Sequence, residues 1–249
     1  MNSFFMAFSM FSRIPVPKVD WEKTNMKYIL CFFPFVGVFI GICEYLAIIL
    51  CEMLGFSNLF KAVLLTVLPV VITGGIHLDG FIDTCDAKHS WKGKDEKLKI
   101  LSDSHVGAFA VIYLVSYMIF DFAMWYEAGK TALFIGCFGF VLSRILSAFA
   151  AVKFKCAKNN GLLFTFKDSA DSKFTAKVII IYFAIVSVII CLYFRFFGAV
   201  AVIVALLTLI YYKIFSYKEF GGVTGDLAGY FLQVCEALIL LSAIICEKI

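Results

Sequence analysis

The sequence is poor in charge. Charged residues make up only 16% of its 249 positions, whereas hydrophobic residues make up 62%. An ordinary soluble domain carries about 25% charged residues. So low a share excludes an ordinary soluble domain, and the composition predicts an integral membrane protein.

The sequence also lacks the patterns that bind zinc. Its nine cysteines are spread mostly through apolar stretches with no CxxC pair, and it has only three histidines. No Cys/His cluster therefore has zinc-ligand spacing, and the cysteines are expected to pack as small buried side chains. No repeat or low-complexity linker divides the chain, so residues 1–249 are expected to form a single integral membrane domain.

The apolar residues are gathered into about seven stretches, each close to the 20 or so residues that cross a bilayer. Arg195 and Gly198 fall where a tight turn would separate two of them. The expected fold is an all-α, polytopic transmembrane helical bundle of about seven spans. The stretches lie near 28–54, 59–76, 107–126, 131–152, 176–194, 196–212 and 227–246.

The first residues, MNSFFMAFSMFSRIPVP, have no basic start, and Pro15 and Pro17 interrupt them. These features do not fit a signal peptide. They favour an interfacial or re-entrant N-terminal helix.

Lysine and arginine concentrate in alternate segments between the apolar stretches. The positive-inside rule places such segments in the cytoplasm, with the N-terminus inside and the C-terminus outside. The net charge of +4 then reflects topology and indicates no nucleic-acid partner. Most unusual polar stretches also fall in these segments, so chemistry is expected at the cytoplasmic face. The segments are 1–27, 77–106, 153–175 and 213–226.

The stretch GGIHLDGFIDTCDAK, residues 74–88, contains three closely spaced aspartates. On a helix turning about 100° per residue, Asp79, Asp83 and Asp86 would share one face. Their mutual repulsion would raise their pKa values unless a cation lay between them. Hard oxygen ligands favour Mg²⁺, which proteins commonly hold together with a substrate phosphate. The alternative is that Asp79 only caps a helix over 80–90 while Asp83 and Asp86 face water.

Three further polar stretches have two interpretations each. In ILSDSHVGAF, 100–109, Asp103 could add a metal ligand or cap the span that follows. In FGGVTGDLAGY, 220–230, the glycine-rich turn could cradle phosphate at a helix N-terminus or serve as a connector. The stretch CAKNNGLLFTFKD, 156–168, could bind an anion or a base, or form a basic surface loop.

Four charged residues lie well inside the apolar stretches, away from their ends: Glu44, Asp121, Arg144 and Glu236. Charges in hydrocarbon are costly, so they are expected to face the bundle or to pair. Arg144 could pair with Glu44 or with Glu236. A secondary transporter could instead use the acids as a proton or ion path.

Taken together, the motifs resemble those of the cobalamin synthases, the adenosylcobinamide-GDP ribazoletransferases. The similar stretches follow the family's order over nearly the whole chain. They are SRIPVP at 12–17, FFPFVGVFIG at 32–41, GGIHLDGFIDTCDA at 74–87, SDSHVGAFAV at 102–111, GLLFTF at 161–166 and GGVTGDLAG at 221–229.

The resemblance implies a Mg²⁺-dependent integral membrane enzyme of a prokaryotic cell membrane. Its reaction joins adenosylcobinamide-GDP to α-ribazole, or to its 5′-phosphate, and releases GMP. This is the last step of nucleotide-loop assembly and yields adenosylcobalamin or its phosphate. The expected partners are these substrates and the lipid bilayer, and self-association into a homo-oligomer stays an open alternative.

The resemblance and the residue patterns together give the candidate site. The expected metal ligands are Asp79, Asp83 and Asp86. The expected catalytic residues are Asp83, Asp86, His77 and Asp103, with a carboxylate or His77 accepting a proton. The lysines of 88–99 and 153–167 would attract the polyanionic substrate. Expected substrate-binding residues are Gly221, Gly222, Thr224, Gly225, Asp226, Ser104, His105 and Lys88.

Two other functions stay open at this point. A CDP-alcohol phosphotransferase of lipid synthesis also combines a membrane bundle with spaced aspartates, but its pattern places AR after DG, and DGFIDTCDA lacks that arginine. A secondary transporter needs ionisable groups near the middle of the membrane with broken helices around them. Here the aspartates lie at the end of a span.

Overall fold

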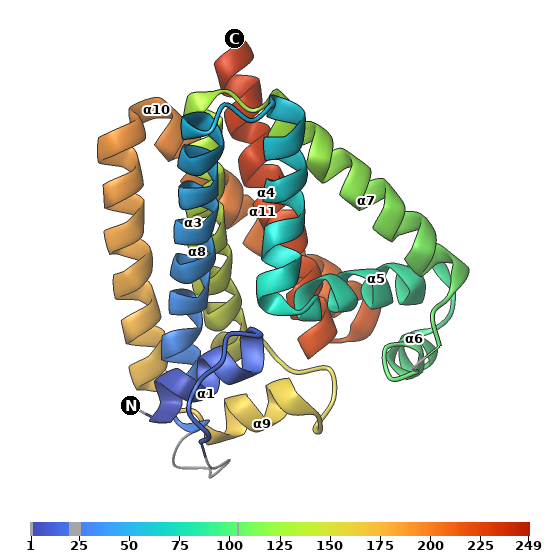
Figure 1. Cartoon of the computed structure of the whole chain (residues 1–249). Coiled ribbons are helices and arrows are strands. Elements are labelled where there is room, and N and C mark those ends of the chain that lie inside the picture. Colours follow the sequence, from blue (N-terminus) through green and yellow to red (C-terminus); the bar gives the residue numbers. More distant parts are fainter. Residues whose placement is uncertain (1, 20–25, 104) are drawn as a thin grey trace.

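The computed structural model describes residues 2–19, 26–103 and 105–249, and Figure 1 shows the arrangement. This part of the chain contains helices and one isolated parallel bridge, between Cys156 and Val223. The helices are α1 (Asn2–Phe11), α3 (Ile29–Met53), α4 (Asn58–Thr73), α5 (Ile76–His89), α6 (Lys94–Ile100), α7 (Ala108–Glu127), α8 (Lys130–Lys153), α9 (Leu162–Ser169), α10 (Ser172–Phe220) and α11 (Gly225–Lys248). The predicted all-α class is confirmed.

The long apolar helices account for the predicted spans. Among the described residues, α3, α7, α8, α10 and α11 are long and apolar enough to cross a membrane. The 49-residue helix α10 is broken at Arg195, whose φ is 49°, so it forms two arms, 172–194 and 196–220. Gly198 makes the break tight, because a Cβ there would lie 2.4 Å from the Ile190 carbonyl oxygen. The turn predicted between two spans is confirmed.

The remaining predicted span corresponds to α4, which has 16 residues. At 1.5 Å per residue it is about 24 Å long, less than the roughly 30 Å hydrocarbon core. It continues into α5 through a bend of 96°. With α4 and both arms of α10, the helices occupy the seven predicted stretches.

Helix α8 lies at the centre of the bundle and packs against α3, α10 and α11. Its contact with α3 depends on two glycines. A Cβ on Gly37 would lie 2.3 Å from the Phe140 carbonyl oxygen, and one on Gly41 would lie 2.6 Å from that of Cys137. Small residues allow such close backbone approach, which is a common source of stability between helices in lipid.

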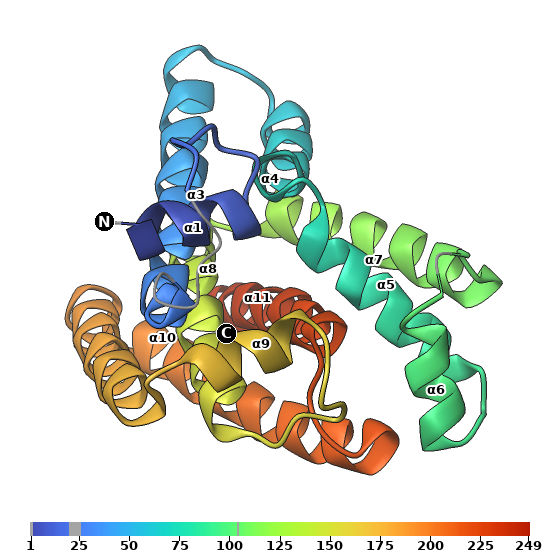
Figure 2. The ribbon, with the colours of Figure 1, turned by 90° about the horizontal axis from the view of Figure 1, so that it is seen from below.

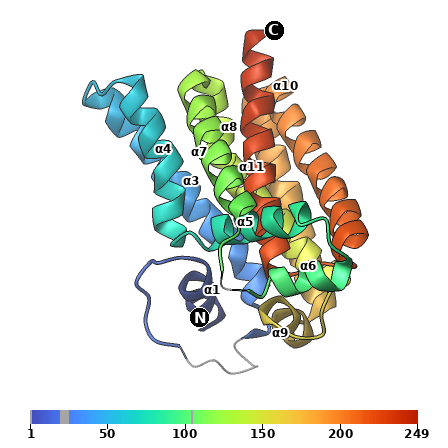
Figure 3. The ribbon, with the colours of Figure 1, turned by 90° about the vertical axis from the view of Figure 1, so that its right-hand side faces the viewer.

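The shorter helices α1, α5, α6 and α9 gather at one end of the bundle, and the C-terminal end of α11 lies at the other (Figures 1 and 3). Figure 2 shows the bundle from the end where the short helices lie. In this view α5 runs beside α7, and α1 lies across α3. Helix α1 has ten residues, too few to span a bilayer. Its position across the end of the bundle agrees with the predicted interfacial helix.

Candidate active site

The turn between α4 and α5 sets the direction of the helix that carries the aspartates. Gly74 and Gly75 both have positive φ, 66° and 78°, which side chains other than glycine rarely adopt. The turn lays α5 across the end of the bundle. Gly75 is the N-cap residue of α5, and Asp79 lies in the first turn. The interpretation of Asp79 as a simple helix cap is therefore wrong, whereas the predicted helix through the three aspartates is confirmed.

Helix α5 crosses α11 at two glycines. A Cβ on Gly80 would lie 2.7 Å from the carbonyl oxygen of Asp226, and one on Gly229 would lie 2.7 Å from that of His77. Backbone contact at this crossing brings two sequence motifs together that are about 145 residues apart. Asp226 of the glycine-rich motif thereby joins the aspartates of α5.

Asp83 lies one turn beyond Asp79 on α5 and is half-buried. Burial, followed by the charges of Asp79, Asp226 and Asp86, raises the pKa of Asp83 from 3.8 to about 7. Asp83 therefore lies within electrostatic reach of three other carboxylates, two on α5 and Asp226 in the first turn of α11. Such a group favours binding a cation, because a cation relieves the repulsion.

The donor chemistry of this group suits Mg²⁺, which takes oxygen ligands and few protein carboxylates. Within the described residues, however, no three His, Cys, Asp or Glu side chains converge closely enough to form a metal site by themselves. The residues fit a metal shared with substrate phosphate better than an all-protein cage. The metal role of Asp79, Asp83 and Asp86 stays a prediction.

Asp86 has a structural contact as well. Its Oδ1 accepts a hydrogen bond from the backbone N–H of Ala110 at 3.4 Å, in the first turn of α7. Its carboxylate fills the space beside Gly107, the N-cap residue of α7. The alternative that Asp103 caps this span is therefore wrong, because Asp86 occupies that position.

The glycine-rich turn is only partly available as a phosphate cradle. The N–H groups of Gly221 and Gly222 donate to the carbonyls of Tyr217 and Ser216 at 3.2 Å, which ends α10. The N–H of Val223 donates to the Lys155 carbonyl at 2.8 Å. These three donors cannot bind phosphate without losing structure. The predicted phosphate cradle over Gly221–Gly225 is therefore wrong for Gly221, Gly222 and Val223.

The usable part of the turn is the start of α11. Thr224 is the N-cap residue, and its Oγ1 accepts from the N–H of Leu227 at 3.2 Å and donates to Asp226 Oδ2 at 3.4 Å. In the described chain, the N–H groups of Thr224 and Gly225 have no hydrogen-bond acceptor. They lie at the positive end of the helix dipole, where an anion is favoured.

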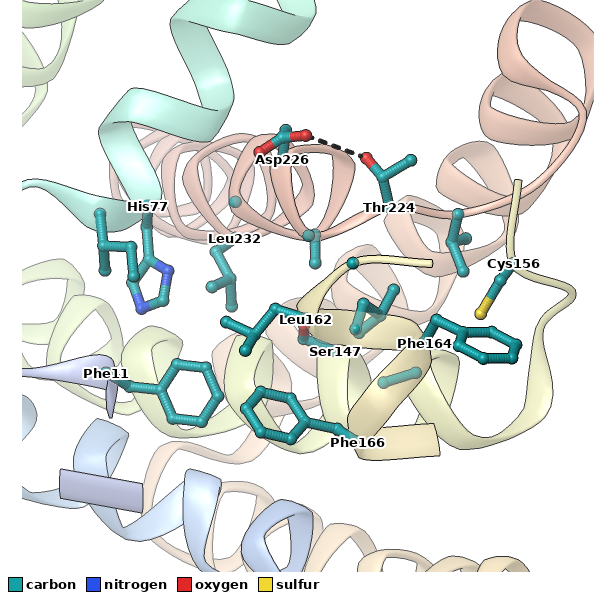
Figure 4. Close-up of a pocket in the computed structure, with 18 of the residues that line it drawn as sticks. Phe11, His77, Ser147, Cys156, Leu162, Phe164, Phe166, Thr224, Asp226 and Leu232 are labelled. Atoms are coloured by element: carbon teal, nitrogen blue, oxygen red, sulfur yellow. Dashed lines mark hydrogen bonds between the residues drawn. The ribbon is translucent and has the colours of Figure 1, made fainter. Parts of the chain in front are cut away.

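A cavity of 340 Å³ lies beside this helix start (Figure 4). Its lining comes from α1, α3, α5, α8, α9 and α11 and from the connecting segments at 102, 156–161 and 223–224. Thr224 and Asp226 lie along one side, and Phe11 and Phe166 face them from the opposite side. Other residues along its wall are Phe33, His77, Asp79, Ser102, Ser147, Lys158, Asn160 and Gly161.

His77 is the buried titratable group of this cavity. It is 6% exposed and lies beside the rings of Phe11 and Phe33, at centroid distances of 6.4 and 5.8 Å. Its Nε2 has no hydrogen-bond partner within the described residues. Burial, and then the charge of Arg144, lowers the pKa of His77 well below its usual 6.5. The imidazole is therefore neutral near pH 7.

Several predicted site residues lie away from the cavity. Asp103 Oδ1 is 2.6 Å from His105 Nδ1 and accepts from the His105 N–H at 3.0 Å, and both residues are exposed. This hydrogen bond raises the pKa of His105. Lys88 places its Nζ over the ring of Phe215, 5.3 Å from the centroid. Ser104 lies outside the described residues.

The lysines predicted to attract a polyanion are partly structural. Lys97 Nζ is 2.6 Å from Glu219 Oε2, which ties α6 to α10. Lys158 Nζ donates to the Leu98 carbonyl at 2.7 Å and to Ser102 Oγ at 2.6 Å. Lys167 donates to the carbonyl of Phe154. Of these three, only Lys158 also lines the cavity.

Sequence reasoning gave no role to Ser147 and no individual role to Asn160, and both residues line the cavity. Ser147 lies one turn beyond Arg144 on α8. A small polar residue so close to a charge within an apolar stretch was the feature of the sequence that could have identified it. Asn160 lies in the stretch 156–168, where a binding loop and a basic surface loop were both open. The cavity favours the binding loop for Asn160 and Gly161.

The buried charges of the spans form one clear pair. Arg144 Nη1 donates to Glu236 Oε1, and Ser143 Oγ donates to the same oxygen at 2.8 Å. Arg144 is 1% exposed. The open pairing of Arg144 is thus decided in favour of Glu236. Both carboxylate oxygens of Glu44 are buried without a hydrogen-bond partner within the described residues.

The model of the family described as Cobalamin-5-phosphate synthase matches residues 3–244 of this chain. An adenosylcobinamide-GDP ribazoletransferase of Lachnoclostridium phytofermentans is 42% identical over 250 residues, covering 100% of this chain and 95% of the relative. A protein of the same name from Clostridium botulinum is 35% identical, covering 96% and 95%. Another from a Geobacillus species is 30% identical, covering 94% and 92%. No solved structure matches the chain.

Proposed function

The chain belongs to the cobalamin-5-phosphate synthase family, and from this premise we propose that it transfers the activated corrin of adenosylcobinamide-GDP to α-ribazole or its 5′-phosphate. It is a multi-pass membrane transferase of cobalamin synthesis. The new bond joins a ribose hydroxyl oxygen of the acceptor to the phosphorus on the corrin side. The diphosphate bond breaks, GMP leaves, and the hydroxyl proton passes to a base.

One observation carries this proposal. The motifs that are similar to the family meet in space although they are far apart in sequence. His77 and Asp79, the stretch 161–166 and the start of α11 line one cavity. A cavity with a free helix N-terminus, neighbouring carboxylates and an aromatic wall suits a substrate that carries both phosphates and flat rings.

The chain's own residues would each have a distinct part. The N–H groups of Thr224 and Gly225 would donate to phosphate oxygens, with Lys158 adding positive charge at the rim. His77, neutral and with a free Nε2, would accept the proton of the attacking hydroxyl. The aromatic side chains of Phe11 and Phe166 would pack against the apolar surface of a substrate and exclude water.

We also propose that Asp79 and Asp83 hold Mg²⁺ together with substrate phosphate, with Asp86 supporting them from its contact with α7. When bound, Mg²⁺ would neutralise charge that develops on the leaving GMP. The raised pKa of Asp83 supports this role, since crowded carboxylates gain most from a cation.

The lysine and arginine distribution supports a location in the cell membrane with the cavity on the cytoplasmic side. The lower layer formed by α1, α5, α6 and α9 would then face the cytoplasm, where nucleotide substrates are available. Family membership leaves the lipid phosphotransferase and the secondary transporter as poorer explanations of the same residues.

The test is transferase activity of the purified protein in detergent. The assay supplies adenosylcobinamide-GDP and α-ribazole, with Mg²⁺ or with excess chelator, and follows corrin product and GMP together. We expect equal amounts of both products, and only with Mg²⁺. GMP without a joined corrin would contradict the transfer, and product formed in chelator would contradict the metal.

A further inference from the structure

A second cavity, of 580 Å³, adjoins the start of α5. It shares Ile76 and Asp79 with the first cavity, and the rest of its lining is different. Its lining comes from the end of α1 and the segment after it, and from the end of α4, the turn that follows and the start of α5. The polar side chains among these residues are Ser9, Ser12, Arg13, Thr73 and Asp79, and Gly74 and Gly75 form the turn.

The motif SRIPVP brings Arg13 to this cavity. Ser12 Oγ donates to the Phe8 carbonyl at 2.6 Å and accepts from the N–H of Ile14 at 3.3 Å, which turns the chain at the end of α1. The N–H of Arg13 then donates to the Ile72 carbonyl of α4 at 2.7 Å. Figure 3 shows the segment after α1 beside the end of α4. This backbone hydrogen bond holds Arg13 in place beside α4 without using its side chain.

Gly74 provides the space for the Arg13 side chain. A Cβ at Gly74 would lie 2.4 Å from Arg13 Nε and 2.6 Å from its Cγ. The positive φ of Gly74 already favours glycine. The side chain therefore lies directly over the turn that begins α5, where it borders the second cavity.

The guanidinium of Arg13 is available to an anion. The side chain is exposed, and Arg13 takes part in none of the ion pairs between described residues. A guanidinium matches the oxygens of phosphate with two parallel hydrogen bonds. Asp79 is the acidic residue lining this cavity, so an anion would be expected on the Arg13 side of it.

We propose that this second cavity receives the acceptor substrate and that Arg13 binds its phosphate monoester. This inference rests on the proposed function. A product that carries a 5-phosphate, as the family description states, keeps one phosphate beyond the diester that the transfer forms. The acceptor must bring that phosphate, and the monoester is unchanged in the reaction. The ribose hydroxyl of the acceptor then points toward Asp79, where the two cavities meet, and the corrin diphosphate occupies the first cavity.

The test compares two acceptors, α-ribazole 5′-phosphate and α-ribazole, in the wild type and in Arg13→Gln. We expect Arg13→Gln to lower the ratio of kcat/KM for the phosphorylated over the unphosphorylated acceptor about 10- to 100-fold, mainly through KM. Arg13→Lys should restore part of the ratio, because it keeps the charge. Lys18→Gln, which removes a nearby exposed charge outside both cavities, should leave the ratio unchanged.

A binding measurement separates this proposal from the proposed function. Calorimetry with α-ribazole 5′-phosphate alone requires no turnover, and Arg13→Gln should weaken that binding by a similar factor. An equal loss for both acceptors, or equal binding of the phosphorylated acceptor by wild type and variant, would overturn the role of Arg13. Wild-type protein that binds the acceptor but forms no product would contradict the proposed function and leave the binding site intact.

Discussion

Gly80 of α5 and Asp226 of α11 are in backbone contact: a Cβ on Gly80 would lie 2.7 Å from the Asp226 carbonyl oxygen and 2.9 Å from its Cα. This contact fixes how close the aspartates of α5 come to the start of α11. It also fixes the width of the cavity between them, since His77 and Asp79 precede Gly80 by less than one turn. The site depends on the absence of a side chain at this position.

Gly80→Ala should separate the two helices. Backbone cannot move aside as a flexible side chain can, so we expect a loss of about 1 to 3 kcal/mol of stability and a larger fractional loss of activity. Gly93→Ala is the matched control, because a Cβ at Gly93 meets nothing within 4 Å. Unfolding in detergent and transferase rates measure both. Equal behaviour of the two variants would refute the importance of the crossing.

Asp83→Asn should remove most of the response to Mg²⁺. The amide keeps the shape of the side chain but loses the charge that attracts the ion, so we expect the half-saturating Mg²⁺ concentration to rise more than about 100-fold. Asp95→Asn, on the exposed part of α6, is the control. An unchanged Mg²⁺ titration in the Asp83 variant would show that the ion is bound elsewhere.

The raised pKa of Asp83 gives a dependence on pH. In the metal-free folded protein this carboxyl has a pKa of about 7, above its ordinary 3.8, so the folded state holds an extra proton between these values. Stability from this group is therefore present at low pH and is lost as pH rises toward and through 7. Bound Mg²⁺ should reverse the loss.

The same competition should appear in Mg²⁺ binding. Since a proton must leave Asp83 before the ion binds, the half-saturating Mg²⁺ concentration should rise about tenfold from pH 8 to pH 6. Thermal unfolding at several Mg²⁺ concentrations measures this without any substrate. Mg²⁺ stabilisation that is equally strong at both pH values would contradict the assignment.

His77→Gln should reduce turnover more than binding. The variant keeps a polar side chain but removes the base, for which a loss of about 100-fold or more in kcat is typical. His89 on the same helix is the control, because its nitrogens already contact the Cys85 carbonyl at 2.8 Å and the Tyr113 hydroxyl at 2.7 Å. His89→Gln should change kcat far less. A His77 variant with normal kcat would assign the base to a carboxylate.

Glu236→Gln should destabilise the bundle strongly, because it leaves the buried charge of Arg144 without its partner. Breaking such a pair costs about 3 to 5 kcal/mol, whereas replacing both residues together with Arg144→Met and Glu236→Leu should restore much of the loss. The exposed pair Lys248–Glu127 is the control, and Glu127→Gln should cost less than about 1 kcal/mol. Unfolding titrations in mixed detergent compare the three, and a double variant as unstable as Glu236→Gln would contradict the pairing.

Much of the molecule follows from the sequence alone. The spans are set by the length of apolar stretches and the thickness of a bilayer, which are local properties, so most of their ends could be predicted within four residues. The exception is the second arm of α10, which continues as helix eight residues beyond the predicted end at 212. The hairpin at Arg195 and the helix that carries Asp79, Asp83 and Asp86 are also local, because a turn signal and a helical period lie within a few neighbouring residues.

Only the tertiary structure decided which of the polar groups meet. Asp86 could be seen as a candidate ligand, but its hydrogen bond to Ala110 depends on where α7 begins beside α5. The N–H groups of Gly221 and Gly222 could be counted as donors, but the end of α10 uses them. Arg13 lies over Gly74, and Gly80 touches Asp226, because helices distant in sequence pack at glycines. Sequence determines which residues can do chemistry; packing contacts between distant segments determine which of them share a cavity.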